Sequence, residues 1–325
     1  MISILILIAI ISGSLLFTVG PVVATLLWTM PIAKMVYEEQ LVRTSPEKWK
    51  RENSCPSDAE YSAMYSGAEE WGKRYEAVSK EVSVQNDGLK LCGRFTDFGS
   101  EKTAIILCGR AEGCIYSYHY AEPYRRAGYN ILVVDQRAHG KSDGKYSGIG
   151  FLEQWDVLRW MKLLETEYHT KHIVLHGACI GAACAVYTAS NPKCPESLKG
   201  IVVDGLFRTF HDVFRARFHT NNRPIFPVLY EIGWLIRRHI GVDIKRQGPI
   251  RYIGKVRCPV LFIHSKEDVS SLPEFVPQLF DACKAPKTLV WMEHGAHSHL
   301  RAANTERYDQ IVTEFTNSLE TASAA

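Results

Sequence analysis

The chain has 325 residues, which is enough for one large α/β domain and a short additional segment. Hydrophobic residues make up 46% and charged residues 22%, a globular composition that excludes a disordered chain, and the net charge of only +3 argues against a dedicated nucleic-acid-binding protein. The nine cysteines show no C-x-x-C spacing, which indicates neither a disulfide framework nor a zinc knuckle and favours a reducing compartment.

The first 33 residues are apolar. No charged side chain precedes Lys34, and Ile2–Trp28 consists mainly of Ile, Leu, Val and Ala. A helix needs ~20 apolar residues to cross a bilayer, so we predict a single transmembrane anchor at 1–33. A cleaved signal peptide would show a basic start and a small-residue cleavage site, and neither is clear. Because five basic residues follow between 34 and 51, the positive-inside rule places the remaining chain on the cytoplasmic side.

Residues 34–74 are polar and helix-compatible, and we expect them to connect the anchor to the main domain at 75–325. That domain begins with two alternating segments, Ala77–Val84 and Leu89–Phe95, around a D-G turn that predicts a β-hairpin.

Short apolar runs then alternate with helical patterns, which predicts an α/β fold with a mostly parallel sheet covered by helices on both faces. The runs are Thr103–Cys108, Asn130–Val134, His172–His176, Gly200–Val203, Pro259–His264 and Thr288–Met292. The helical patterns are Tyr116–Ala127, Phe151–Glu165, Ile180–Asn191, Pro273–Cys283 and Thr305–Leu319.

An insertion at about 206–255 interrupts this alternation and is too long for an ordinary connection. Between Arg208 and Arg257 the chain has eleven Lys and Arg but only three Asp and Glu. The arginines either face an anionic surface or form a solvated helical face. The segment also carries aromatic residues that either line an apolar site or pack the segment's own core, namely Phe207, Phe210, Phe214, Phe218, Phe226, Tyr230 and Trp234.

A predicted strand leads into Gly177–Gly181, a G-x-C-x-G motif that is followed by a helix of small residues. This context is typical of a nucleophile elbow, a turn so tight that the residues flanking the nucleophile must be small. Cys179 is therefore a candidate nucleophile. The alternative is a buried cysteine that acts only as a small apolar residue.

Three further motifs occur in a fixed order. Asp135–Ser142 matches the pattern D-x-R-x-H-G-x-S, Phe262–Asp268 ends an apolar run with an acid, and Gly295–His297 is followed by Glu306–Tyr308. Residues from about 75 to 319 thus resemble the α/β-hydrolase superfamily, in particular bacterial membrane-anchored hydrolases of the serine aminopeptidase-like and lysophospholipase-like group. The chain departs from these relatives by having Cys179 at the position of the nucleophilic serine.

The resemblance implies a catalytic triad of Cys179, Asp268 and His297. It also implies that the 206–255 insertion forms a helical lid over the elbow, and that the backbone N–H groups of Arg110 and Ile180 form the oxyanion hole. In relatives the loop of Arg110 begins with histidine, but here it begins with Cys108. No cofactor and no metal are implied.

Several assignments remain open from the residues alone. Asp204, at the end of an earlier apolar run, is an alternative acid. His294 and His299 are alternatives to His297, and the three histidines could instead bind a metal, although no acidic cluster of known spacing accompanies them.

We therefore expect a hydrolase that cleaves ester, lactone or thioester bonds of small or lipid-like acyl substrates through an acyl-enzyme. Its partners would be the small-molecule substrate and the membrane, bound through the N-terminal helix and the basic lid. The alternative is an inactive hydrolase-fold protein that binds a ligand or partner at the membrane. The sequence does not indicate an oligomeric state.

Overall fold

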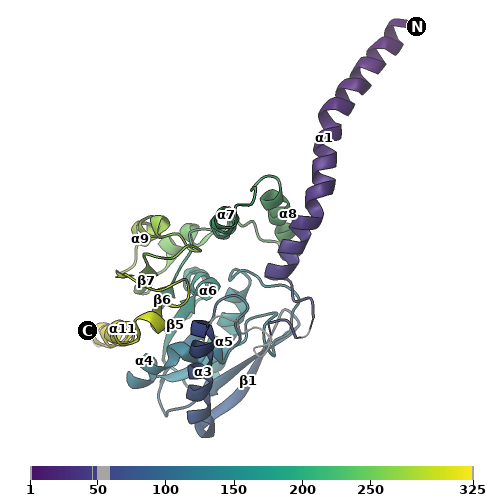
Figure 1. The fold of residues 1–325 in the computed structure, drawn as a ribbon. Coiled ribbons are helices and arrows are strands. Elements are labelled where there is room, and N and C mark those ends of the chain that lie inside the picture. Colours follow the sequence, from purple (N-terminus) through teal and green to yellow (C-terminus); the bar gives the residue numbers. More distant parts are fainter. Residues whose placement is uncertain (1, 46, 50–58, 324–325) are drawn as a thin grey trace.

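A computed structural model describes residues 2–45, 47–49 and 59–323 (Figure 1). Eight strands form one sheet in the order β1-β2-β4-β3-β5-β6-β7-β8. Only β1–β2 and β2–β4 pair antiparallel, and all other neighbours are parallel. The strands are β1 (Ser79–Asn86), β2 (Leu89–Thr96), β3 (Lys102–Leu107), β4 (Asn130–Val134), β5 (His172–Ala178), β6 (Leu198–Asp204), β7 (Val260–Ser265) and β8 (Lys287–Met292). The predicted hairpin and the six predicted parallel strands are confirmed.

The hairpin register is set by its two-residue turn. Asn86 faces Leu89 across the strands, and the residues between them, Asp87 and Gly88, have φ angles of 51° and 74°. Positive φ at both central positions defines the turn type that matches the twist of paired strands, which explains the D-G signal in the sequence.

Both faces of the sheet are buried because the side chains of the central strands alternate between two apolar layers. In β3, Ile105 and Leu107 join the layer under α5 (Glu153–Glu167), α6 (Ile180–Ser190) and α9 (Val276–Ala282). Ala104 and Ile106 join the opposite layer. That layer is covered by α3 (Ala59–Arg74), the 3-10 helix η2 (Tyr116–Tyr120), α4 (Ala121–Arg126), α10 (Leu300–Ala303) and α11 (Thr305–Ser323).

The 206–255 insertion forms two helices between β6 and β7, α7 (Phe210–Thr220) and α8 (Val228–Ile240). Some of its aromatic residues pack in the core, as the second alternative predicts, and the others are exposed. Phe207, Phe210, Phe214 and Phe218 are buried in the protein core. By contrast, Phe226, Tyr230 and Trp234 are 73%, 56% and 56% exposed. The spacing of four residues places Tyr230 and Trp234 on one side of α8, and the ring of Phe226, which precedes α8, contacts that of Tyr230. Short 3-10 helices complete the fold: η1 (Glu76–Val78), η3 (Pro249–Arg251), η4 (Ile253–Lys255) and η5 (Pro273–Phe275).

The N-terminal helix α1 (Ile2–Leu41) projects from the domain, and α8 lies beside its base (Figure 1). Within the part whose burial is described, Val19–Leu41 is long and apolar enough to cross a membrane. The helix continues without a break past position 33, and its last turns bury Val36 and Leu41 in the core. The expected connection at 34–74 thus begins as helix α1 and ends as α3, while residues 46 and 50–58 lie outside the described residues.

Candidate active site

Cys179 occupies a strained turn between β5 and α6. Its φ and ψ angles are 53° and −112°, a region that residues with a Cβ rarely adopt and that costs on the order of 1–3 kcal/mol. The backbone N–H of Cys179 donates to the carbonyl of Asp204 at 2.9 Å, so the neighbouring strand β6 holds the turn in place. This geometry matches a nucleophile elbow, in which the strained backbone presents the side chain at the top of the sheet.

The glycines of the motif are required by close backbone approach. A Cβ on Gly177 would lie 2.2 Å from the backbone of Gly181, and a Cβ on Gly181 would lie 2.0 Å from the carbonyl oxygen of Leu107. The start of α6 therefore packs directly on the end of β3. This contact brings the loop that follows Leu107 next to Cys179.

His297 and Asp268 meet at the same edge of the sheet. Asp268 follows β7, and its Oδ2 atom lies 2.7 Å from Nδ1 of His297. The second oxygen, Oδ1, accepts from the backbone N–H groups of Ser270 at 2.8 Å and Ser271 at 2.7 Å. The carboxylate is therefore held from both sides, which fixes the orientation of the imidazole ring.

The pKa shifts of His297 and Asp268 indicate that the charge of His297 interacts with both Cys179 and Asp268. Burial acts to lower the pKa of His297, but the neighbouring Cys179 and Asp268 outweigh it, through charge and side-chain hydrogen bonds, and raise that pKa well above its ordinary value. Burial acts to raise the pKa of Asp268, but His297 and other neighbours lower it below its ordinary value. The structure thus brings the predicted nucleophile, histidine and acid into one contiguous group.

The two predicted oxyanion donors belong to segments that meet at Cys179, because the start of α6 packs on the end of β3. Ile180 is the first residue of α6, so its N–H has no acceptor within the helix. Arg110 lies in the loop after β3, and the backbone N–H of Arg110 has no hydrogen bond among the residues that are described. Both donors are therefore free to bind an oxygen atom of a ligand.

Residues that the motif analysis did not assign hold the Arg110 loop. The buried carboxylate of Glu112 accepts from the backbone N–H of Gly109 at 2.7 Å and from the hydroxyl of Tyr61 at 2.5 Å. On the other side, the N–H of Ala111 donates to Nε2 of His139 at 3.1 Å. Burial lowers the pKa of His139 to about 4, so its ring is a neutral acceptor. Sequence offered no signal for the Tyr61 contact, because Tyr61 comes from the connecting segment.

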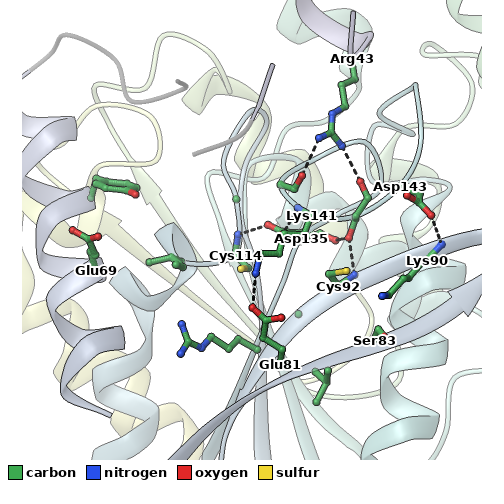
Figure 2. Close-up of a pocket in the computed structure, with 18 residues that line it drawn as sticks. Arg43, Glu69, Glu81, Ser83, Lys90, Cys92, Cys114, Asp135, Lys141 and Asp143 are labelled. Atoms are coloured by element: carbon green, nitrogen blue, oxygen red, sulfur yellow. Dashed lines mark hydrogen bonds and ion pairs between the residues drawn. The ribbon is translucent and has the colours of Figure 1, made fainter. Parts of the chain in front are cut away.

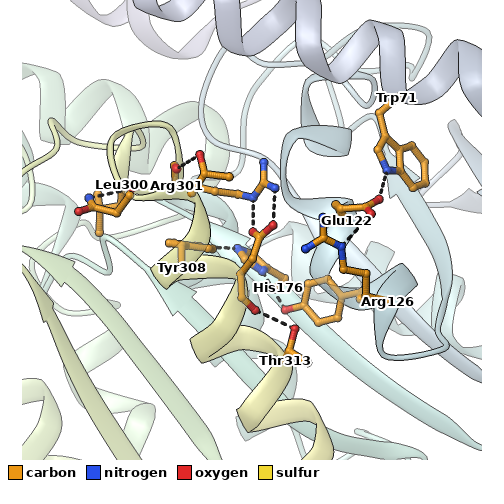
Figure 3. A network of polar contacts seen from close by, with 12 residues as sticks. Trp71, Glu122, Arg126, His176, Leu300, Arg301, Tyr308 and Thr313 are labelled. Atoms are coloured by element: carbon orange, nitrogen blue, oxygen red, sulfur yellow. Dashed lines mark hydrogen bonds and ion pairs between the residues drawn. The ribbon is translucent and has the colours of Figure 1, made fainter.

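The alternative acid, Asp204, has a different partner. Its Oδ2 atom accepts from the hydroxyl of Tyr308 at 2.7 Å, and that hydroxyl also lies 3.1 Å from Nε2 of His176. Figure 3 shows His176, Tyr308 and Arg301 within a network of polar contacts, and Arg301 donates to Asp309 of α11 at 2.6 and 2.8 Å. Asp204 thus belongs to a buried network beside the triad.

The alternative histidines also separate. His294 is exposed and contacts Glu267 at 3.1 Å, whereas His299 lies 3.2 Å from Glu60. Within the described ranges, no group of three or more His, Cys, Asp or Glu side chains could hold a metal ion. The histidine cluster in the sequence therefore does not form a cluster in space.

A cavity of about 930 Å³ lies at the β1–β2 hairpin and the 135–143 turn, and Cys179 is not among the residues that line it (Figure 2). Its lining side chains already pair with one another. Asp135 accepts from the backbone N–H groups of Cys114 at 2.7 Å and Lys141 at 2.9 Å, and Lys141 contacts Glu81. These contacts shape the turn that carries His139, which in turn contacts the Arg110 loop. None of the predicted site residues lines the cavity.

Comparison with known proteins gives consistent results. A sequence profile of the alpha/beta hydrolase fold family matches residues 104–223. The uncharacterized protein YqkD of Bacillus subtilis is 28% identical over 67% of this chain and 72% of its own length. The uncharacterized membrane protein YNL320W of Saccharomyces cerevisiae is 24% identical over 73% of this chain and 78% of its own.

Solved structures share the fold. The esterase Pf2001 of Pyrococcus furiosus superposes with a TM-score of 0.63 at 24% identity, covering 76% of this chain and 93% of its own. An acylaminoacyl peptidase of Pyrococcus horikoshii superposes with a TM-score of 0.55 at 16% identity, covering 76% of this chain and 43% of its own. The profile match, the sheet topology and these neighbours together show that the chain has the α/β-hydrolase fold.

Proposed function

We propose that the protein is a hydrolase that cleaves carboxylic ester, lactone or thioester bonds through a Cys179–His297–Asp268 triad. The observation that carries this proposal is the position of Cys179. It occupies the strained elbow, and its side chain contacts a histidine whose Nδ1 lies 2.7 Å from the buried carboxylate of Asp268. A cysteine without a catalytic role has no need for this costly backbone conformation or for these two partners.

The chemistry follows from the tautomer that Asp268 selects. Nδ1 of His297 donates to Asp268, so Nε2 is the atom that takes the proton from the Cys179 thiol. The sulfur forms a bond to the carbonyl carbon, and the carbonyl oxygen becomes an oxyanion that accepts from the N–H groups of Arg110 and Ile180. The bond to the leaving group then breaks, and the leaving alcohol or thiol takes the proton from His297.

The second half of the cycle consumes water. The acyl group is now a thioester on Cys179, and Nε2 of His297 takes a proton from an attacking water molecule. Collapse of the second oxyanion releases the carboxylic acid and returns the proton to the sulfur. Thiolate is a good leaving group, so this cycle favours esters, lactones and thioesters over amides.

The surroundings of the lid support lipid-like substrates at a membrane. The exposed side of α8 carries Tyr230 and Trp234, with the exposed Phe226 just before the helix, and Thr29 of α1 donates to Glu231 of α8 at 2.7 Å. The lid is therefore attached to the helix that we propose as the membrane anchor. Aromatic side chains favour the interface between lipid and water. We infer that the domain lies on the cytoplasmic side, with the lid against the bilayer.

Replacement of the nucleophile tests the proposal. We expect Cys179→Ala to abolish hydrolysis of p-nitrophenyl and thioester acyl substrates of graded length, and Cys179→Ser to keep measurable esterase activity. Cys194→Ala is the matched control, because burial raises the pKa of that thiol to about 11 and it lies outside the site. Equal turnover by wild type and Cys179→Ala, or no turnover of any substrate by wild type, would support the inactive binding protein instead.

A further inference from the structure

Arg110 has a side chain that the proposed mechanism does not use. It is partly buried, yet its guanidinium has no hydrogen bond and no ion pair with any described residue. A guanidinium carries five N–H donors, and because Arg110 is only partly buried these donors remain open to a ligand. The nearest acidic residue in the loop, Glu112, is already held by Gly109 and Tyr61.

Two further positively charged side chains lie near the guanidinium of Arg110. They are Arg217 of α7 and Lys48, which follows α1, and both repel the Arg110 charge. Burial lowers the pKa of Arg110 below its ordinary value, Cys179 opposes this, and Arg217 adds to it. Burial likewise lowers the pKa of Lys48, with Arg110 adding to the shift.

The side chains of Lys48 and Arg217 differ from that of Arg110 because both have hydrogen-bond partners. The ammonium of Lys48 donates to the carbonyls of Glu38 and Val42 at 2.6 Å each. Arg217 donates to Gln40 at 3.3 Å and lies 3.9 Å from Glu39. Of these three neighbouring cations, Arg110 is the one whose side chain has no hydrogen bond or ion pair with a described residue, and its charge interacts with Cys179.

We propose that Arg110 binds an anionic group of the substrate, a carboxylate or a phosphate, beside the carbonyl that Cys179 attacks. This inference rests on the proposed hydrolase and narrows its substrates to acyl compounds that carry a negative charge near the scissile bond. The planar guanidinium can bind two oxygen atoms of either group at once, which favours it over an ammonium. The backbone of Arg110 binds the oxyanion while its side chain selects the substrate.

Alkylation of Cys179 tests the anion site without requiring turnover. Iodoacetate and iodoacetamide deliver the same carbon to sulfur, but only iodoacetate is charged. We expect the ratio of their rates at Cys179, measured by mass spectrometry of the full chain, to exceed the ratio for glutathione by at least tenfold. Arg110→Met should lower that ratio by about tenfold, and Arg110→Lys should restore part of it.

The matched control is Arg215→Met. Arg215 is an exposed arginine on α7 that lines a separate cavity near Phe275, so the ratio should stay within twofold of wild type. A wild-type ratio no greater than that of glutathione would overturn the proposal. So would a high ratio that Arg110→Met leaves unchanged, because His297 rather than Arg110 would then attract the anion.

A matched pair of esters extends the test to substrates. We expect kcat/KM for mono-p-nitrophenyl adipate to exceed that for p-nitrophenyl hexanoate, with the difference mainly in KM, and Arg110→Met to reduce this preference at least tenfold. Cleavage of both esters without preference would refute the anion site but leave the hydrolase intact. Cleavage of neither, with the alkylation preference present, would refute the hydrolase alone. Inhibition by acetate or by inorganic phosphate, at constant ionic strength, distinguishes a carboxylate from a phosphate site.

Discussion

The elbow and the lid are built in opposite ways. At the elbow, the carboxyl ends of β5 and β6 fix the turn through backbone contacts, such as the 2.9 Å bond from Cys179 to Asp204, and Asp268 after β7 orients His297 through its side chain. The lid helix α8 instead lies against α1 with an exposed aromatic side, and one of its few polar links to α1 is the 2.7 Å bond from Thr29 to Glu231. In the proposed function, the sheet would therefore set the chemistry, whereas the lid and α1 would set which molecules reach it.

The largest expected effect concerns the histidine and its acid. His297→Ala should lower kcat/KM by about 10³-fold or more, and Asp268→Asn by a similar order, because each removes a group that the others need. His294→Ala is the control, since the His294 side chain is exposed and pairs with the exposed Glu267 outside the triad. Steady-state kinetics on one ester decide the matter. Equal losses in the His294 and His297 variants would contradict the assignment.

The next largest effect concerns the lid. A protein lacking residues 1–33 keeps the buried Val36 and Leu41, and it should still bind liposomes that contain anionic lipid. Replacing both Arg237 and Arg238 with Glu should weaken this binding at least tenfold, because each charge near an anionic leaflet contributes about 1 kcal/mol. Flotation at increasing salt measures the effect.

A charge reversal far from the lid provides the matched control for that experiment. Lys171 precedes β5 at the opposite end of the sheet and has a side chain that is 66% exposed. Lys171→Glu should leave liposome binding unchanged. If the shortened protein ignores anionic liposomes even at low salt, the lid does not face a membrane.

The same contrast explains what the sequence could predict. The elbow is formed by neighbouring residues, so Gly177 and Gly181 were enough to predict the tight turn around Cys179. The alternation of apolar strands with helices was likewise enough to predict a sheet that is buried on both faces. The clamp on the oxyanion loop is not local. Tyr61 and Glu112 are 51 positions apart and meet only because α3 packs on η2, so no spacing rule connects them. The packing of α1 on α8 could not be predicted from the sequence for the same reason. The apolar residues of each helix do not specify which partner they contact.

A smaller effect is expected at this clamp. Glu112→Gln places an amide N–H₂ group against the donors of Gly109 or Tyr61, which should shift the Arg110 loop. We expect kcat to fall about tenfold, equivalent to about 1.4 kcal/mol, with KM little changed. Tyr61→Phe removes one hydrogen bond and should have a milder effect. Glu69→Gln, at an exposed position of the same helix α3, should have none.

The smallest effect on activity is expected at Asp204, where the consequence is for stability. Burial is the main cause that raises the pKa of Asp204 to about 7, and Oδ1 has no hydrogen-bond partner among the described residues. The folded protein therefore holds this proton more tightly than the unfolded chain, whose aspartate has a pKa of about 3.9. As pH rises from about 4 to about 7, the unfolded chain loses the proton first, so the contribution of Asp204 to stability decreases, and above pH 7 it stays constant.

Asp204→Asn cannot ionise, and its amide oxygen can still accept from Tyr308. The free energy of unfolding of the variant minus that of wild type should therefore increase between about pH 4 and pH 7 by up to about 4 kcal/mol, at about 1.4 kcal/mol for each pKa unit. Taking the difference cancels the other titrating groups, including the buried histidines, whose depressed pKa values act in the opposite direction in this range. Urea unfolding at a series of pH values measures it. A difference that is independent of pH would mean that Asp204 is ionised in the folded protein, and it would then compete with Asp268 for the charge of His297.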